Sequence, residues 1–210
     1  MSSISSVNRE SSRDNDISQT FRRRCVEFLL QRRVRITVVV FAALIAEDVL
    51  VGFRPHDLLN YHDGHTLLGL ALVAAGVATR TWAAGILHKR KQLMTVGPYA
   101  LIRHPLYAGS LIMMIGFAAL IDDPENIWII LGPMLGMYIL RALHEERVLS
   151  RHFSSQWEEY AKVVPRFIPY RGSKHVLAPW SVTQWIRNRE YRAVVAVAIG
   201  LMAIEAWSRY

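Results

Sequence analysis

Long apolar blocks constrain the fold of this chain more than any other feature of its sequence. An α-helix needs about 20 apolar residues to cross the roughly 30 Å hydrocarbon core of a bilayer. Five blocks come close to that length, at residues 36–53, 66–87, 106–121, 127–143 and 191–207. We therefore predict an all-α, polytopic integral membrane protein with about five transmembrane helices. The third block is short, so we expect it either to continue past one end or to lie at a thinned edge of the bilayer.

Composition narrows the class further. The 210 residues are 52% hydrophobic although 20% are charged, so the apolar residues must be concentrated in the blocks. The net charge is +8, but anchoring at the membrane surface accounts for basic residues that flank transmembrane blocks, and no nucleic-acid partner is expected. The single cysteine, Cys25, excludes a disulfide framework and a thiolate metal cluster.

Basic residues alternate between the segments that separate the blocks. Residues 1–35 hold eight arginines and residues 144–190 hold eight basic residues, whereas 122–126 hold none. The 88–105 segment holds four basic residues, and the 54–65 segment holds only Arg54. Because cytoplasmic loops are enriched in Lys and Arg, we predict a cytoplasmic N-terminus, five crossings and an external C-terminus.

The chain divides into three expected regions. Residues 1–20 are Ser-rich, charged and poor in apolar groups, which predicts a disordered tail. Residues 21–35 place apolar side chains at helical spacing among arginines, which predicts a basic amphipathic juxtamembrane helix on the anionic leaflet. Residues 36–210 then form a single membrane domain, and no feature indicates an oligomeric state.

The first inner segment, residues 88–109, carries more specific residues than orientation requires. Gly97-Pro98 signals a turn, and Pro105 suits the first position of a helix, where its missing N–H has no cost. His104 is therefore expected next to the helix cap. The N-terminal amides of such a helix attract anions, and Arg103 strengthens this field. On spacing alone, an ordinary inner loop followed by a proline-started helix explains these residues equally well.

The second inner segment, residues 138–170, combines carboxylates with aromatic residues. Arg141 and Glu145 fall near one face of the helix that leaves the fourth block. As an exposed ion pair they would contribute only about 0.3–0.5 kcal/mol to the stability of the helix. The adjacent carboxylates Glu145 and Glu146 are also what a cation site needs. Pro165 and Pro169 bracket a short apolar stretch that can fold back over the inner face.

Together the two segments resemble the isoprenylcysteine carboxyl methyltransferase family. The resemblance is carried by Gly97-Pro98-Tyr99, Arg103-His104-Pro105-x-Tyr107, Glu145-Glu146, Phe153, Tyr160 and Pro165. It covers residues 80–170, and the family belongs to a wider group of membrane methyltransferases that includes phospholipid N-methyltransferases. It implies a multi-span helical fold and an S-adenosylmethionine cofactor near the cytoplasmic face of the membrane.

The resemblance also implies roles for individual residues. The cofactor-binding residues that it implies are His88, Gly97, Tyr99, His104, Pro105, Tyr107, Glu145, Glu146, Pro165 and Arg166. Arg103 and Glu145 are the expected catalytic residues. A guanidinium holds planar oxygens bidentately, so Arg103 can orient an anionic acceptor. Glu145 or Glu146 suits the ammonium group of the methyl donor.

These features predict methyl transfer from S-adenosylmethionine to a lipophilic, membrane-embedded acceptor, with a carboxylate like that of an isoprenylated cysteine preferred. A carboxylate is already ionised at neutral pH, whereas an amine would need a glutamate to take its proton. The alternatives are a phospholipid amine or small thiol methyltransferase, a sterol-reductase-like membrane oxidoreductase, and a non-catalytic membrane scaffold. Pro105-Leu106 stands where the reductase motif carries an asparagine, which disfavours the reductase.

Two polar features lie outside the motifs. Arg80 falls inside the second block, nearer its inner end, and is expected either to line a cavity or to extend to the membrane surface. His56, His62, Asp63 and His65 gather in the predicted outer loop. Because they lack a regular ligand spacing, we expect a solvated loop there and no metal site.

Overall fold

The computed structural model describes residues 54–60, 62–88, 92–122, 124–170, 172 and 175–209, together with residues 39, 43, 46, 47 and 50–52. Only the backbone is described for residues 124–131. The chain divides into two compact units, Met1–Ala43 and Leu44–Tyr210, and all the helices below belong to the second. The predicted tail, the predicted juxtamembrane helix and most of the 36–53 block lie outside the described residues.

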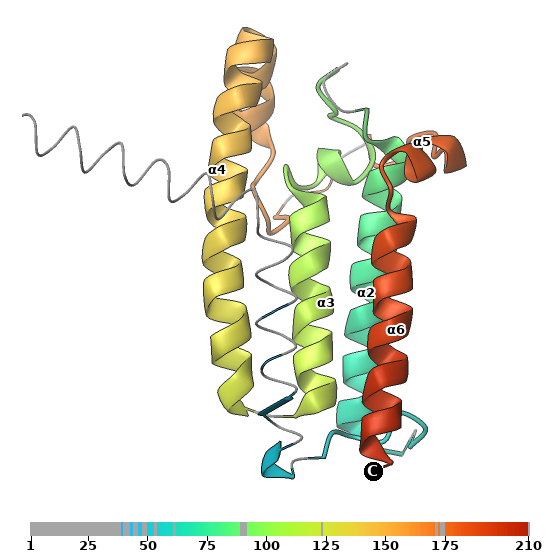
Figure 1. Cartoon of the computed structure of the whole chain (residues 1–210). Helices are drawn as coiled ribbons and strands as arrows, with labels where there is room; N and C mark the ends of the chain where they lie inside the picture. Colours follow the sequence, from blue (N-terminus) through green and yellow to red (C-terminus); the bar gives the residue numbers. More distant parts are fainter. Residues whose placement is uncertain are drawn as a thin grey trace, which may run out of the picture. The chain divides into compact units, whose positions relative to one another are not determined.

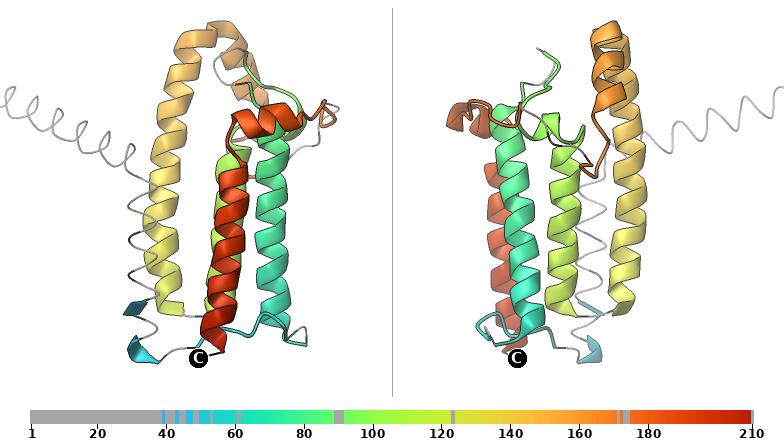
Figure 2. Two further views of the ribbon diagram at one scale, coloured as in Figure 1. Left: turned by 45° about the vertical axis from the view of Figure 1, so that its right-hand side comes forward. Right: turned by 180° about the vertical axis from the view of Figure 1, so that it is seen from behind.

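The regular secondary structure in the described part of the second unit is all helical, as predicted. Its elements are α2 (Gly64–Ile86), η1 (Gly97–Ala100), α3 (Pro105–Ile121), α4 (Pro124–Val163), α5 (Val182–Arg187) and α6 (Tyr191–Ser208). Helices α2, α3, α4 and α6 stand side by side, and their chain direction alternates between successive helices along the sequence until the short α5 (Figure 1). Figure 2 shows that η1, α5 and the start of α3 lie at one end, which we call the site end. The loop at residues 54–63 lies at the opposite, far end.

The predicted blocks at 66–87, 106–121 and 191–207 coincide with α2, α3 and α6, and the 127–143 block lies within the longer α4. Helices α2 and α6, with 23 and 18 residues, are long and apolar enough to cross a membrane by length and composition. Helix α3 is apolar but has only 17 residues. It does not continue past either end as one expectation held, because Pro105 occupies its first position and Asp122 ends it in a left-handed conformation (φ 60°).

Helices α2 and α3 approach each other backbone to backbone through pairs of glycines. A carbon added at Gly76 would lie 2.6 Å from the carbonyl oxygen of Gly109, and one added at Gly116 would lie 2.8 Å from that of Gly69. Small residues allow such close packing, which supplies much of the attraction between helices in lipid. This packing holds the start of α3, and with it His104, at a defined height beside α2.

A largely buried ion pair joins α2 to α3 and α6. Arg80 donates from Nε to Glu190 Oε1 at 2.6 Å and from Nη2 to Glu190 Oε2 at 3.0 Å. Its Nη1 donates to Ser110 Oγ at 2.5 Å and to the Leu106 carbonyl oxygen at 3.3 Å. The sequence left open whether Arg80 lines a cavity or reaches the membrane surface. The structure shows a third arrangement, in which Arg80 connects three helices.

Helix α4 carries the second motif segment back toward the first. Ser154 interrupts it with non-helical dihedral angles (φ 43°, ψ −114°), and the helical residues beyond it run back down toward the start of α3 (Figure 2). The segment that follows pairs with the loop before α3. The amide of Arg103 donates to the Pro165 carbonyl at 2.8 Å, and that of His104 donates to the Arg166 carbonyl at 3.2 Å.

Helix α5 caps the end of α2. The last carbonyl groups of a helix have no partner within it, and here the segment around α5 supplies donors. Gln184 Nε2 donates to Leu87 O at 2.5 Å, Asn188 Nδ2 donates to Ala84 O at 2.8 Å, and the Ser181 amide donates to Gly85 O at 3.0 Å. The site end is therefore closed by direct hydrogen bonds.

Candidate active site

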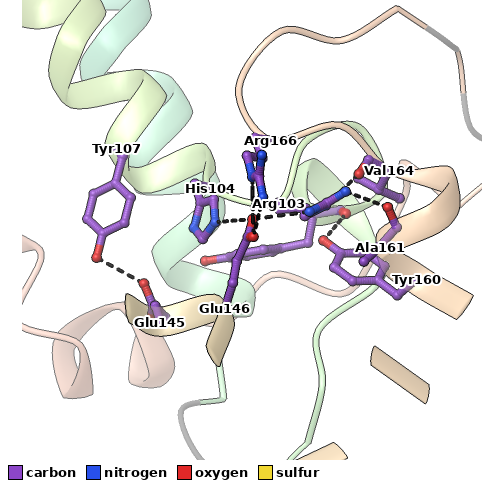
Figure 3. Close-up of polar contacts among 10 residues, drawn as sticks. Arg103, His104, Tyr107, Glu145, Glu146, Tyr160, Ala161, Val164 and Arg166 are labelled. Carbon is purple, nitrogen blue, oxygen red and sulfur yellow. Dashed lines mark hydrogen bonds and ion pairs between the residues drawn. The ribbon is translucent and has the colours of Figure 1, made fainter. Parts of the chain in front are cut away.

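Glu146 is the centre of a buried ionic network at the start of α3 (Figure 3). Its carboxylate accepts hydrogen bonds from Arg103 Nη1 at 3.1 Å, His104 Nε2 at 3.2 Å, and Arg166 Nε and Nη2 at 3.0 and 2.9 Å. Arg103 and His104 precede α3, whereas Arg166 follows α4. A single carboxylate thus joins the two motif segments that the sequence singled out.

Arg103 bonds to the protein through all three nitrogens of its guanidinium. Nε donates to Val164 O at 2.6 Å, Nη1 donates to Glu146, and Nη2 donates to the Ala161 carbonyl. The guanidinium carbon lies 5.9 Å from the centre of the Trp157 ring. These bonds attach the C-terminal end of α4 to the loop before α3.

His104 is buried between this network and aromatic rings. Its ring centre lies 5.6 Å from that of Tyr107 and 5.7 Å from that of Phe167. Burial lowers the pKa of His104 below its ordinary value, although the nearby carboxylates of Glu145 and Glu146 act in the opposite direction. His104 is therefore neutral at pH 7, and its Nε2–H is the group that can donate to Glu146.

The pKa of Glu146 lies below its ordinary value. Burial alone would raise it, but hydrogen bonds from Arg166 and His104, together with the charge of Arg103, outweigh that effect. The carboxylate is consequently ionised at neutral pH and matched by two arginines. Removing one partner of a buried ion pair is strongly destabilising, by about 3–5 kcal/mol, and this applies to Arg103 and Glu146, whose side chains are 14% and 11% exposed. The pairing with Arg166 contributes less, because that side chain is 52% exposed.

Glu145 is exposed, in contrast to its neighbour. Its Oε2 accepts a hydrogen bond from the Tyr107 hydroxyl at 2.9 Å (Figure 3). The Tyr107 ring centre lies 5.4 Å from that of Tyr138 in α4. Among the described residues, no cation lies within ion-pair distance of Glu145. Its negative charge therefore remains open to a cationic ligand.

Helix η1 forms the wall beside this site. Gly97 has φ +64°, and a carbon added to it would lie 2.5 Å from Ile86 Cδ1, so only glycine fits there. The Tyr160 hydroxyl donates to Tyr99 O at 2.7 Å and links α4 to η1. The hydroxyl of Tyr99 is itself buried without a hydrogen-bond partner among the described residues. Burial raises the pKa of Tyr99 well above its ordinary value, so this hydroxyl keeps its proton.

The remaining expected site residues have different surroundings. Pro105 is fully buried at the first position of α3, and Pro165 contributes its carbonyl oxygen to the bond with Arg103. His88 Nδ1 lies 2.8 Å from Ile86 O, at the end of its own helix. No described hydrogen bond or ion pair joins His88 to the Glu146 network.

A hollow that is open to solvent adjoins the network at Glu146 and Arg166. Its volume is about 390 Å³, within the range of roughly 300–1,000 Å³ typical of small-molecule sites. Its lining includes Glu146 and three arginines, Arg147, Arg151 and Arg166. Because Glu146 is already paired with Arg103 and Arg166, the lining carries a net positive charge and suits an anion.

Sequence reasoning identified both segments but missed several contributors. It did not find the carbonyl acceptors of Ala161 and Val164, because backbone groups leave no trace in residue identity. It also passed over Arg147 and Arg151, which are four residues apart and therefore share one face of α4. This spacing could have predicted that both arginines line the same side of the hollow.

The chain is similar in sequence to a family of methyltransferases and to two metal-resistance proteins. Residues 65–156 match the phospholipid methyltransferase family. The nickel-cobalt-cadmium resistance protein NccN of Alcaligenes xylosoxydans xylosoxydans is 30% identical over 145 residues, which cover 68% of this chain and 67% of that protein. The cobalt-zinc-cadmium resistance protein CzcN of Cupriavidus metallidurans is 30% identical over 161 residues, which cover 74% and 72%.

A third relative is a methyltransferase by name. Protein-S-isoprenylcysteine O-methyltransferase B of Arabidopsis thaliana is 30% identical over 110 residues, or 51% of this chain and 54% of that protein. The similarity to this relative thus spans about half of each chain. No solved structure matches the chain.

Proposed function

Because the chain belongs to the family of membrane methyltransferases that includes the phospholipid and isoprenylcysteine enzymes, and is an S-adenosylmethionine-dependent methyltransferase, we propose that it methylates a carboxylate on a lipophilic, membrane-embedded acceptor. The observation that carries this proposal is that an exposed carboxylate and a basic hollow lie next to each other at the site end. An exposed carboxylate, Glu145, lies next in sequence to Glu146, whose hollow is lined by three arginines.

The residues at the site end fit the donor in three respects. S-Adenosylmethionine, when bound, supplies an electrophilic methyl group on a positively charged sulfonium. Glu145 is an exposed carboxylate without a described cation and can hold an ammonium group. Arg166 pairs with Glu146 through one edge while its side chain remains 52% exposed, so it can hold a carboxylate. The Tyr99 hydroxyl, which has no hydrogen-bond partner in the described part of the chain, can donate to a further polar group.

The surplus of positive charge favours an anionic acceptor. Arg147 and Arg151 line the hollow beside Arg166, so a protonated amine would be repelled there, whereas a carboxylate would be attracted. A carboxylate also needs no base at neutral pH. Amine methylation, which the matched phospholipid methyltransferase family suggests, would instead require Glu145 to accept a proton.

In this proposal Arg103 is a positioning residue. Its guanidinium nitrogens hold the end of α4 and Glu146 in place, and so align the carboxylates and arginines of the two segments. Methyl transfer needs donor and acceptor about 3–3.5 Å apart in a water-poor site. The rings of Trp157 and Phe167 beside the network help to exclude water.

We propose that the domain crosses the membrane five times, with its N-terminus and its site end in the cytoplasm. The basic residues at 1–35, 88–105 and 144–190 support this orientation. The acceptor would then reach the site from the inner leaflet.

Calorimetric binding of S-adenosylhomocysteine to the detergent-purified full chain tests the donor site. Glu145→Gln should weaken binding at least tenfold, because a hydrogen bond to a charged group contributes about 1.5–3 kcal/mol. Glu158→Gln is the matched control, since Glu158 is also an exposed glutamate of α4. Wild-type affinity in Glu145→Gln would contradict the role of Glu145. No binding by folded wild-type protein would contradict the donor site itself.

Methyl transfer from radiolabelled S-adenosylmethionine tests the acceptor. We expect label on a farnesylated cysteine with a free carboxylate and none on its carboxamide. The product should release methanol in base, as an ester does. Base-stable label on phosphatidylethanolamine, with no label on the carboxylate, would establish the amine reaction and overturn the carboxylate proposal.

A further inference from the structure

A second cluster of polar side chains lies at the far end of the helices, away from the Glu146 network. One possible ligand atom from each of His56, Asp63 and His65 lies within 4.8 Å of the other two. These residues belong to the 54–63 loop and the first turn of α2, at the opposite end of α2 from η1 and α5 (Figure 1). The methyl-transfer site makes no use of them.

The backbone that carries this cluster is held by bonds outside it. The amide of His56 donates to Leu120 O at 3.1 Å, which fastens the loop to the end of α3. The amide of Leu58 donates to Glu205 Oε2 of α6 at 3.2 Å. Asp63 is the N-cap of α2 and accepts from the amides of His65 and Thr66 at 3.2 and 3.3 Å. The side chains therefore project from a preorganised frame, as a binding site requires.

His56 meets a carboxylate at each of its ring nitrogens. Nδ1 lies 2.7 Å from Asp63 Oδ2, and Nε2 lies 3.1 Å from Asp122 Oδ2. Nε2 is buried and forms no directed hydrogen bond. A neutral imidazole that donates from Nδ1 carries its lone pair on Nε2, so this lone pair faces a negative group. A cation between Nε2 and Asp122 would satisfy both.

The same contacts match the surroundings of metal-bound histidines. Such a histidine usually donates its other ring N–H to a carboxylate, which fixes the orientation of the ring, and Asp63 can accept in this way from His56. The ring of His65 stacks on that of His56 with a centroid separation of 5.7 Å. Because the His65 side chain is 72% exposed, it can turn toward a shared ion.

The spacing suits a small ion with four ligands. Metal–ligand bonds of about 2.0–2.1 Å in a tetrahedron place ligand atoms about 3.3 Å apart. Two separations bracket that value: His56 Nε2 lies 3.1 Å from Asp122 Oδ2, and His65 Nδ1 lies 3.6 Å from Asp63 Oδ1. The other oxygen of Asp63, Oδ2, lies 2.7 Å from His56 Nδ1 and can accept its N–H. Small side-chain movements would therefore complete the site.

We propose that His56, Asp63, His65 and Asp122 bind one first-row divalent transition-metal ion of the Zn²⁺, Co²⁺ or Ni²⁺ class. Two imidazoles with two carboxylates suit these ions, whereas Mg²⁺ and Ca²⁺ prefer oxygen ligands alone. The sequence predicted a solvated loop here because the loop residues lack a regular ligand spacing. Asp122, the C-cap of α3, reaches the 54–63 loop only through the antiparallel packing of α2 and α3. A bound ion would cross-link the start of α2 to the end of α3.

Cobalt binding to the full-length, tag-free protein in detergent tests this proposal. We expect one Co²⁺ per chain with the intense visible absorption of a tetrahedral site, displaced by Zn²⁺ but not by excess Mg²⁺. His65→Ala and Asp63→Asn should each weaken binding at least about tenfold. Asn can still cap a helix, so Asp63→Asn removes the charge without removing the cap.

His62→Ala, in the same loop but outside the cluster, is the matched control and should bind Co²⁺ like the wild type. The midpoint of thermal unfolding, measured in parallel, establishes that each variant is folded, and Zn²⁺ should raise it in the wild type but not in His65→Ala. Co²⁺ binding that persists in both His65→Ala and Asp63→Asn would place the ion elsewhere and overturn the proposal. Folded wild-type protein without stoichiometric Co²⁺ would also overturn it.

Discussion

Glu145 and Glu146 are adjacent in sequence, yet their surroundings differ because successive residues of an α-helix point about 100° apart. Glu146 turns toward Arg103, His104 and Arg166, and Glu145 turns toward Tyr107 and solvent. The sequence indicated that this pair mattered but not which member is buried in the ionic network. That choice depends on where the chain returns after Ser154 and brings Arg166 to Glu146, which no local pattern encodes.

Tyr99→Phe tests the buried hydroxyl of η1. The Tyr99 hydroxyl has no described partner, and an unsatisfied buried polar group costs about 1–3 kcal/mol. The variant should therefore unfold at the same or a higher temperature than the wild type. If the hydroxyl serves the cofactor, affinity for S-adenosylhomocysteine should fall about 3–10-fold, as loss of a single hydrogen bond implies. A thermal midpoint well below that of the wild type would show instead that the hydroxyl is satisfied within the protein.

The pH dependence of stability should reflect His104. Its folded pKa is lowered from 6.5, so the unfolded chain binds the proton more tightly than the folded protein. The stability that neutral His104 contributes is thus fully present above about pH 6.5 and is lost as pH falls through the folded pKa. The pKa of Glu146 is lowered from 4.5, so protonation of Glu146 causes a further loss of stability at lower pH.

Thermal unfolding of the wild type and of His104→Gln between pH 7.5 and 5 measures this effect. The wild-type midpoint should fall more steeply than that of the variant as pH is lowered. The pKa of Glu146 is lowered from 4.5, so Glu146 stays ionised over this pH range, and a glutamine amide can replace the imidazole as its hydrogen-bond donor. Parallel curves would contradict the assignment of a depressed pKa to His104.

At the scale of the elements, the length of the apolar blocks predicted where the helices lie, but nothing in the sequence predicted where a helix reverses. The blocks at 66–87, 106–121 and 191–207 match α2, α3 and α6 within two residues at either end. Five of these six ends are set by residues visible in the sequence: Asp63 and Glu190 are N-caps, Pro105 begins α3, and Asp122 and Arg209 are C-caps. The reversal at Ser154 was not predicted, because serine is not a residue that favours φ near +43°. The capping of α2 by α5 was also missed, since Gln184 and Asn188 act on a helix distant in sequence.

Gly76→Val tests the packing of α2 on α3. A carbon at Gly76 would lie 2.4 Å from Met113 Cγ and 2.6 Å from Gly109 O, and the backbone oxygen cannot move aside. We expect a loss of about 2–3 kcal/mol in the free energy of unfolding. The displacement should also weaken S-adenosylhomocysteine binding, because α3 carries His104 at its start.

Gly64→Ala is the control for this variant. Gly64 is the first residue of α2, and no described atom lies within 4 Å of an added carbon there. The change should leave the midpoint of thermal unfolding equal or slightly higher, since replacing glycine by alanine at a compatible position stabilises by about 0.4–1 kcal/mol. Equal midpoints for Gly76→Val and Gly64→Ala would contradict close packing at the glycine pairs.

At the scale of the whole molecule, the two proposed sites lie at opposite ends of α2. The Glu146 network lies at the site end and the His56 cluster lies at the far end, joined by α2. If α2 crosses the membrane, the two ends face different compartments. The basic residues of the 88–105 and 144–190 segments predict that the site end faces the cytoplasm.

Cysteine labelling in spheroplasts and in inverted vesicles tests this orientation. Cys25 is the only native cysteine, so each new position can be read in a Cys25→Ser background. Leu59→Cys, in the exposed far-end loop, should react with a membrane-impermeant maleimide in spheroplasts. Native Cys25 and Lys162→Cys, an exposed position near the site end, should react only in inverted vesicles. Labelling of positions 59 and 162 from the same side would mean that α2 does not cross the membrane. Labelling of position 162 in spheroplasts and of position 59 only in inverted vesicles would show that α2 crosses the membrane in the opposite orientation. Methyl transfer would then take place outside the cytoplasm, and S-adenosylmethionine would first have to be exported.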